Sequence, residues 1–148
     1  MECIGPEPDS SAELHHAATV LVVEDEELVC EITCEVLGHA GYEVLHAGSA
    51  AEARTLFAKR GAQIDILLCD AVLPDQNGID LADMLAREFP ALQIVISSGY
   101  PRAALNQSSQ EGNEVAFLTK PYSGHAMLAK IRTMVESRAA ARQSSVSA

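Results

Sequence analysis

The chain has 148 residues, enough for one domain with one sizeable core, and 48% of them are hydrophobic. Ten Lys and Arg residues stand against 21 Asp and Glu, a formal net charge of −11, so direct binding to nucleic acid or to an anionic membrane surface is not expected. No apolar run approaches the roughly 18–20 residues that cross a bilayer. Residues 1–19 carry no secretion signal, and the four cysteines form no CxxC pair. We therefore expect a cytoplasmic protein.

Two short arms flank a strongly patterned middle segment. Residues 1–18 contain Pro, Asp and Ser with little apolar periodicity, so we expect a flexible N-terminal arm. Residues 139–148 are rich in Ala and Ser, and we expect a flexible C-terminal tail. The segment between them, residues 19–138, is predicted to form one folded domain.

Within this domain, short apolar runs typical of buried strands alternate with segments of helical periodicity. In chain order we expect a strand at 20–23, a helix at 27–40, a strand at 42–47, a helix from 49 to 59, a strand at 64–69, a helix at 81–89, a strand at 93–97, a short helix at 101–107, a strand at 115–119 and a last helix from 123. Ser49 is placed to cap the second helix, with Glu52 as its capping-box partner. Five strands alternating with five helices predict an α/β fold with a parallel sheet and helices on both faces.

Polar residues gather where the predicted strands end, which is where function collects in such sheets. Glu24-Asp25-Glu26 follows the first strand, Asp70 the third, Ser97-Ser98-Gly99 the fourth and Thr119-Lys120-Pro121 the fifth. Clustered carboxylates repel one another unless a cation joins them, and Mg²⁺ is a hard ion that binds carboxylate oxygens beside a phosphate. Together with a lysine and a hydroxyl, this set suits phosphoryl transfer to an aspartate nucleophile.

Four segments in this order resemble the response-regulator receiver domains of two-component signalling, over about residues 19–138. They are Val20-Leu-Val-Val-Glu-Asp-Glu, Leu68-Cys-Asp-Ala-Val-Leu-Pro-Asp-Gln-Asn-Gly, Ile96-Ser-Ser-Gly-Tyr and Phe117-Leu-Thr-Lys-Pro-Tyr. The resemblance implies a flavodoxin-like, three-layer fold with strand order 2-1-3-4-5. It also implies a phosphorelay signalling receiver rather than an enzyme, which accepts a phosphoryl group from a sensor histidine kinase or a phosphotransfer protein.

The resemblance assigns the chemical roles by position. Asp70 would be the phosphoacceptor, and Lys120 would pair with the phosphoryl oxygens. Glu24, Asp25 and the main-chain carbonyl of Val72 would join Asp70 in binding Mg²⁺, for which Mn²⁺ could substitute. The peptide bond after Lys120 is expected to be cis, which a following proline permits.

The resemblance also implies a switch. A serine hydroxyl would bond to the phosphoryl group, and Phe117, at the family's aromatic switch position, would then move inward. Either Ser97 or Ser98 could supply the hydroxyl; we favour Ser98 because it directly precedes Gly99 and because its spacing from Lys120 fits the family. The signal would leave through the face formed by the segment 101–107, the fifth strand and the last helix, to a downstream protein or to a homodimer formed on phosphorylation.

The residues leave several questions open. Val72 and Tyr100 stand two residues after Asp70 and Ser98, and neither side chain can readily orient a water, which predicts a long-lived phosphorylated state. The two arms are too short for an output module, so the chain is either a stand-alone regulator or a receiver from a hybrid kinase.

Two other functions use some of the same residues. A Mg²⁺-dependent phosphatase with an aspartate nucleophile would carry a second acid where this chain has Val72. A pseudo-receiver, which binds partners without being phosphorylated, would not need the intact acidic pair, Asp70, Ser98 and Lys120.

Overall fold

The computed structural model describes residues 18–99 and 115–147, and a five-stranded parallel sheet in the order β2-β1-β3-β4-β5 lies at its centre. The strands are β1 (Thr19–Val23), β2 (Glu43–Ala47), β3 (Ile66–Asp70), β4 (Gln93–Ser98) and β5 (Val115–Thr119). The helices are α2 (Glu27–His39), α3 (Ala50–Arg60), α4 (Gly78–Glu88) and α5 (Gly124–Ser147), with a 3-10 turn, η1, at Gly61–Gln63. The parallel pairing of all neighbouring strands and their order confirm the predicted fold class.

Two of the observed elements differ clearly from the prediction. The third strand begins at Ile66 rather than at residue 64, because the chain first winds through η1, where Ile64 N donates to Gly61 O at 3.1 Å. The last helix runs to Ser147, past the predicted boundary at residue 138, and three alanines at 139–141 favour this continuation. The short helix expected at 101–107 lies outside the described residues, and the flexibility of the two arms stays a prediction.

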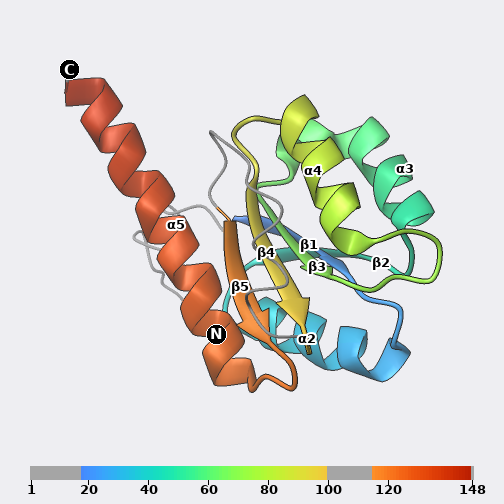
Figure 1. The fold of residues 1–148 in the computed structure, drawn as a ribbon. Helices are drawn as coiled ribbons and strands as arrows, with labels where there is room; N and C mark the ends of the chain where they lie inside the picture. Colours follow the sequence, from blue (N-terminus) through green and yellow to red (C-terminus); the bar gives the residue numbers. More distant parts are fainter. Residues whose placement is uncertain (1–17, 100–114, 148) are drawn as a thin grey trace, which may run out of the picture.

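Two buried clusters lie on opposite faces of the sheet. Figure 1 shows α3 and α4 together over one face and α2 and α5 over the other. Side chains alternate between the faces along each strand: Leu67 and Cys69 of β3 belong to the α3/α4 cluster, whereas Ile66 and Leu68 belong to the α2/α5 cluster. Because both faces are covered, β1, β3 and β4 are buried at every residue, which explains why their sequences are continuous apolar runs.

The helices that flank the functional edge of the sheet have well-defined starts. Ser49 caps α3, as predicted, with Oγ accepting from Glu52 N at 3.2 Å. The Glu52 carboxylate accepts from Gly48 N at 2.6 Å, one residue earlier than a standard capping box requires. Asn77 caps α4 by accepting from Ile79 N at 2.7 Å. Across residues 18–99 and 115–147, none of the helices combines the length and the apolar character needed to cross a membrane.

Gly78, the first residue of α4, lies directly against the end of β3. A Cβ at position 78 would overlap the main-chain oxygen of Asp70 and would lie 2.9 Å from its carbonyl carbon. Gly78 N donates to Ala71 O at 2.8 Å, which holds the start of the helix in this place. The helix therefore begins in contact with the backbone of Asp70, an approach that only glycine permits.

We expect Gly78→Ala to lower the free energy of unfolding by about 3 kcal/mol, because the added methyl group meets rigid backbone. Urea unfolding followed by circular dichroism measures this change. Gly38→Ala is the matched control: Gly38 is exposed in α2 with nothing within 4 Å of an added Cβ, so this change should stabilise the protein by about 0.5–1 kcal/mol. Equal stabilities of the two variants would contradict the close packing at Gly78.

Candidate functional site

The register of the sheet brings the predicted acidic residues together. Val23 of β1 pairs with Cys69 of β3, so Glu24 and Asp70, the next residues, lie side by side at the carboxyl edge. One carboxylate oxygen from each of Glu24, Asp25 and Asp70 lies within 4.8 Å of the other two. The structure thus gathers the three predicted carboxylates in one cluster.

Lys120 contacts two of these carboxylates. Its Nζ lies 2.8 Å from Asp70 Oδ2 and 3.1 Å from Glu24 Oε1. Lys120 N donates to Ser98 O at 2.8 Å, which fixes the segment after β5 against the end of β4. The peptide bond between Lys120 and Pro121 is cis, as expected. The ammonium therefore reaches the acidic cluster from the far side of β4.

Burial and charge together set the electrostatics of the site. Glu24 and Asp70 are 4% and 7% exposed, whereas Asp25 is exposed. Burial raises the pKa of Glu24, and the Asp70 charge adds to the rise, while bonds from Glu26 N and Lys120 oppose it. For Lys120, burial lowers the pKa, but the bonds to Asp70 and Glu24 raise it by more, so the ammonium stays protonated. The carboxylates outnumber the ammonium, and hard oxygen donors with excess negative charge fit a divalent cation such as Mg²⁺.

The loop between β3 and α4, residues 71–77, forms the other wall of the site. Val72 N donates to Asp70 Oδ1 at 3.1 Å, and Val72 forms a bridge with Asn77 across the loop. The two oxygens of Asp70 therefore have different partners, Val72 N on one and Lys120 on the other. An open pocket of about 500 Å³, whose lining includes Asp25, Asp70 and Lys120, gives access to this carboxylate. The Val72 side chain also lines this pocket and is 56% exposed.

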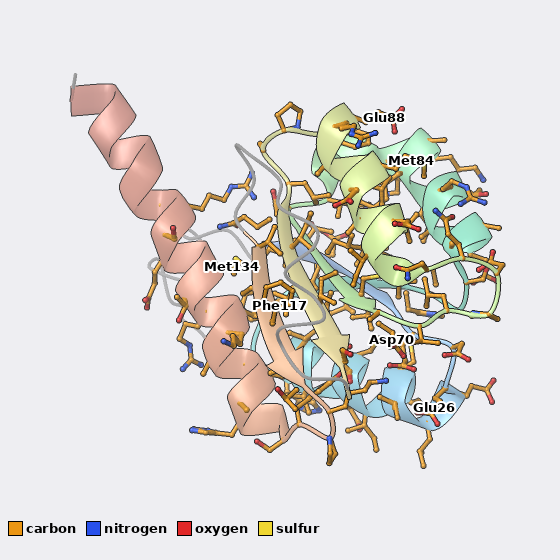
Figure 2. All side chains as sticks on the ribbon, viewed as in Figure 1. Glu26, Asp70, Met84, Glu88, Phe117 and Met134 are labelled. Carbon is orange, nitrogen blue, oxygen red and sulfur yellow. The ribbon has the colours of Figure 1, made fainter. Side chains whose placement is uncertain are left out.

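The two candidate switch serines face opposite sides of the sheet. Ser97 is two residues after Val95 and so points to the α2/α5 face, whereas Ser98 is two residues after Ile96 and points to the α3/α4 face. Both serines are buried. Phe117 of β5 packs against the α3/α4 cluster and pairs with Ile96. Figure 2 shows Phe117 on β5 and Asp70 at the end of the sheet. Ser98 is thus the serine that shares a face with Phe117, and its strand, β4, lies between β3, which carries Asp70, and β5, which carries Phe117.

Two contacts near the site could not be read from the sequence. The Asp75 carboxylate accepts from Ala50 N at 2.9 Å and from Ala51 N at 3.0 Å, which ties the β3–α4 loop to α3. Thr33 Oγ1 lies 3.2 Å from Tyr122 OH, a hydrogen bond that ties α2 to the segment after β5. A Pro-Asp pair signals a turn, but nothing in the sequence names a partner 25 positions away.

An apolar groove adjoins the acidic pocket between α2 and the segment after β5. Its volume is about 450 Å³, and it shares Glu26 and Lys120 with the acidic pocket. Leu28, beside the groove on α2, is 66% exposed, and Ile32 in its lining is 52% exposed. Apolar surface left open next to a charged site is typical of a surface that binds another molecule.

Comparison with known proteins places this geometry in a family. The chain matches the model of the response regulator receiver domain over residues 20–132. It is similar to sensor kinase CckA of Brucella abortus (strain 2308), with 30% identity over 128 residues, 86% of this chain but 14% of the kinase. It is similar to response regulator receiver protein CpdR of the same organism, with 28% identity over 116 residues, 78% of this chain and 95% of CpdR. The chain also spans 49% of the probable transcriptional regulatory protein TcrX of Mycobacterium tuberculosis.

Solved structures show the same fold. A CheY-like receiver domain from Methanospirillum hungatei JF-1 matches with a TM-score of 0.75 and 24% identity, over 83% of this chain and 97% of that one. NtrX from Brucella abortus matches with a TM-score of 0.79 and 23% identity, over 90% of this chain and 30% of that one. The sheet order, the family model and these relatives agree, and the chain belongs to the response regulator receiver family of two-component and phosphorelay signalling.

Proposed function

We propose that this receiver accepts a phosphoryl group on Asp70 in a Mg²⁺-dependent reaction and passes the resulting change of shape to a partner protein. The observation that carries the proposal is the 2.8 Å contact between Lys120 Nζ and Asp70 Oδ2 inside a buried acidic cluster. Phosphoryl transfer needs positioning and charge neutralisation more than covalent chemistry from the protein, and this pair supplies both.

The residues that would hold Mg²⁺ are Glu24, Asp25, Asp70 and the main-chain carbonyl of Val72, and Mn²⁺ could take its place. Three carboxylates whose oxygens converge within 4.8 Å support this assignment. When bound, the ion supplies positive charge for the oxygens of the transferred group. Lys120 supplies the second positive charge from the protein itself.

The reaction proceeds at one oxygen of Asp70. That oxygen forms a bond to phosphorus while the bond between phosphorus and the donor's imidazole nitrogen breaks. Lys120 then pairs with the phosphoryl oxygens, and the Ser98 hydroxyl turns toward them. Phe117, on the same face as Ser98, takes the space that opens, so the phosphoryl group biases an element with two states. The change reaches the surface of β5, α5 and the segment 101–107, which lies outside the described residues, where a downstream protein or a second copy would bind.

Asp70 acts as a phosphoacceptor with a single turnover rather than as the nucleophile of a phosphatase. A hydrolase of that kind keeps a second acid two residues after its nucleophile, and here that residue is the apolar Val72. The pseudo-receiver alternative is disfavoured because Asp70, Lys120 and the acidic pair are present and in contact. The free thiols of Cys30, Cys34 and Cys69 agree with a reducing cytoplasmic location.

Incubation with Mg²⁺ and acetyl phosphate, read by intact mass, tests the proposal. We expect the wild type to gain one phosphoryl group, Asp70→Asn to gain none, and the control Asp80→Asn, changed at an exposed position on α4, to gain one. Beryllofluoride should then shift the NMR signals of Phe117 and its neighbours on β5. Steady phosphate release from unrelated monoesters would favour the phosphatase instead, and no adduct and no spectral change would favour the pseudo-receiver.

The lifetime of the phosphorylated form is a second expected outcome. Val72 lines the pocket beside Asp70 and offers no group that could hold an attacking water. We expect Val72→Asn to speed the loss of phosphate by about three- to tenfold, because an amide can position that water. Phosphate loss after removal of acetyl phosphate measures the rate, and Met84→Gln, on the exposed side of α4 (Figure 2), is the control. Tyr100, the second residue that we expect to limit the access of water to the phosphorylated site, lies outside the described residues.

If Val72→Asn loses phosphate no faster than the wild type, the side chain at this position does not govern the lifetime. A similar acceleration in Met84→Gln would show that the effect is a general loosening of the fold rather than water access at the pocket.

The groove beside the acidic pocket is the surface that we assign to the phosphodonor protein. A donor helix that fills it would bring its phosphohistidine to the pocket, because Glu26 and Lys120 border both spaces. The exposed apolar residues Ile32, in the lining of the groove, and Leu28, beside it, would contact the donor. Acidic side chains lie next to them along α2, at Glu27, Glu31 and Glu35, so the partner should carry basic residues around an apolar centre.

We expect Ile32→Glu to slow phosphoryl transfer from a phosphohistidine protein, selected for its transfer to the wild type, by roughly tenfold or more. The rate with acetyl phosphate should not change, because that small donor needs only the pocket. Met84→Glu also places a glutamate at an exposed apolar position, on α4 away from the groove, and is the control. Equal transfer to Ile32→Glu and to the wild type would contradict this docking surface.

A further inference from the structure

We propose that Asp75 is a positioning residue, which holds the β3–α4 loop in place for metal binding by capping the first turn of α3. Asp75 lies five residues after the phosphoacceptor and is not part of the pocket lining. It would act through the loop that carries Val72, one of the proposed metal ligands. The inference rests on the proposed function, because it requires a metal ion to bind at Asp70 and Val72.

The contacts of Asp75 are specific and use both of its carboxylate oxygens. Oδ1 accepts from Ala50 N at 2.9 Å, and Oδ2 accepts from Ala51 N at 3.0 Å. These are first-turn amides of α3, which have no acceptor within their own helix. Ser49 Oγ takes the next amide, that of Glu52, at 3.2 Å. The first turn of α3 is therefore completed by a residue from a different loop, and the hydrogen bonds from Ala50 and Ala51 lower the pKa of Asp75.

The loop is also anchored at its base and again beside Asp75. At the base, Val72 N donates to the Asp70 carboxylate and Val72 bridges to Asn77. Next to Asp75, the Gln76 side chain accepts a hydrogen bond from Arg54 of α3. Two consecutive residues of the loop thus bind to the same helix, and the Asp75 contacts are the ones that reach main-chain donors.

The end of β2 that leads into α3 is tied to the other acidic loop. Glu24 N donates to Ala47 O at 3.0 Å, and Ala47 ends β2 three residues before Ala50. The segment from Ala47 to the first turn of α3 therefore lies between the loop that carries Glu24 and the loop that carries Val72. It is joined to the first by the main-chain bond at Ala47 and to the second by Asp75 at the first turn of α3. Because the proposed metal ligands come from both loops, the separation of the ligands depends on this connection.

A simple helix cap and a positioning residue make different predictions. A cap contributes stability to α3 and nothing else. A positioning residue also changes how tightly the folded protein binds the metal ion, although the residue never touches the ion. The effect must then be seen at temperatures where every variant is fully folded.

The test compares Asp75→Ala with Asp80→Ala. Both changes remove one negative charge from an exposed position near the site, but Asp80 makes no bond to α3 among those found in the structure. We expect Asp75→Ala to bind Mg²⁺ about three- to tenfold more weakly in a calorimetric titration, and Asp80→Ala to stay within about twofold of the wild type. Asp75→Asn, which keeps one acceptor oxygen, should fall between the wild type and Asp75→Ala.

Two further measurements separate positioning from a loss of reactivity. Hydrogen exchange at the amides of Ala50 and Ala51 should speed up in Asp75→Ala, which confirms that the cap has been removed. At saturating Mg²⁺, the rate of phosphorylation by acetyl phosphate should return close to that of the wild type, because Asp70 and Lys120 are unchanged.

Faster exchange at Ala50 and Ala51 with unchanged Mg²⁺ affinity would overturn the inference and leave Asp75 as a helix cap. Equal weakening in Asp75→Ala and Asp80→Ala would overturn it as well, because charge alone would then explain the loss. A wild type that binds no Mg²⁺ and accepts no phosphoryl group would contradict both the proposed function and this inference. This outcome differs from the first two, in which the wild type still binds Mg²⁺.

Discussion

Glu24 and Asp70 are two carboxylates held at a buried edge of the sheet, and within the described residues the cation in contact with both is Lys120. Two like charges at 4–5 Å repel by about 3–4 kcal/mol at the effective dielectric of a protein, and desolvation adds several kcal/mol per ion. One ammonium offsets part of this, and burial, the largest cause, keeps the pKa of Glu24 raised. The three carboxylates of the cluster outnumber the ammonium, and a divalent cation or an approaching electrophile would relieve the excess negative charge.

Such repulsion can persist only on a rigid support. The strands that carry Glu24 and Asp70 are buried along their whole length, so the carboxylates cannot separate without breaking the sheet. The two flanking loops are less constrained: one is bonded to Ala47 at the end of β2, and the other is bonded to the first turn of α3 through Asp75. The rigid strands therefore fix the positions of the charged carboxylates, whereas the loops would set the exact positions of the proposed metal ligands.

The edge of the sheet is also where its two faces meet. The apolar groove opens on the side of α2 and α5, whereas Ser98 and Phe117 face α3 and α4. In the proposed function, the donor thus binds on one face while the response begins on the other. A phosphoryl group on Asp70 would lie at the edge between these two faces. One small group could therefore end the contact with the donor on the α2/α5 face and start the movement of Ser98 and Phe117 on the α3/α4 face.

The sequence predicts much of this arrangement because the physics behind it is local. Buried parallel strands leave continuous apolar runs, and the polar residues that follow each run must meet at one edge, which is why Glu24, Asp70 and Lys120 could be placed together. The two hydrogen bonds that Asp75 accepts from Ala50 N and Ala51 N have no such signature, since a turn residue and a helix start with unsatisfied amides each look ordinary alone. The extension of α5 to Ser147 was missed because the local sequence gives two conflicting signals. Its Ala- and Ser-rich composition suggested a tail, while its alanines favour a helix. From the sequence, Ser98 is favoured over Ser97 by Gly99 and by the spacing from Lys120. The face of the sheet on which each serine lies can be assigned only when the cluster on each face is known.

The contacts of Asp70 show how the site could move from rest to reaction. Its Oδ1 accepts from Val72 N and its Oδ2 contacts Lys120, so both oxygens have partners. A new bond to phosphorus requires one oxygen to give up its partner. Val72 N is fixed by the loop, whereas Lys120 lies at the end of a flexible side chain that is 23% exposed and carries three donors. Lys120 is the partner that can leave Asp70 for the phosphoryl oxygens while keeping its contact with Glu24, so the same ion pair that relieves the resting site can follow the charge as it moves.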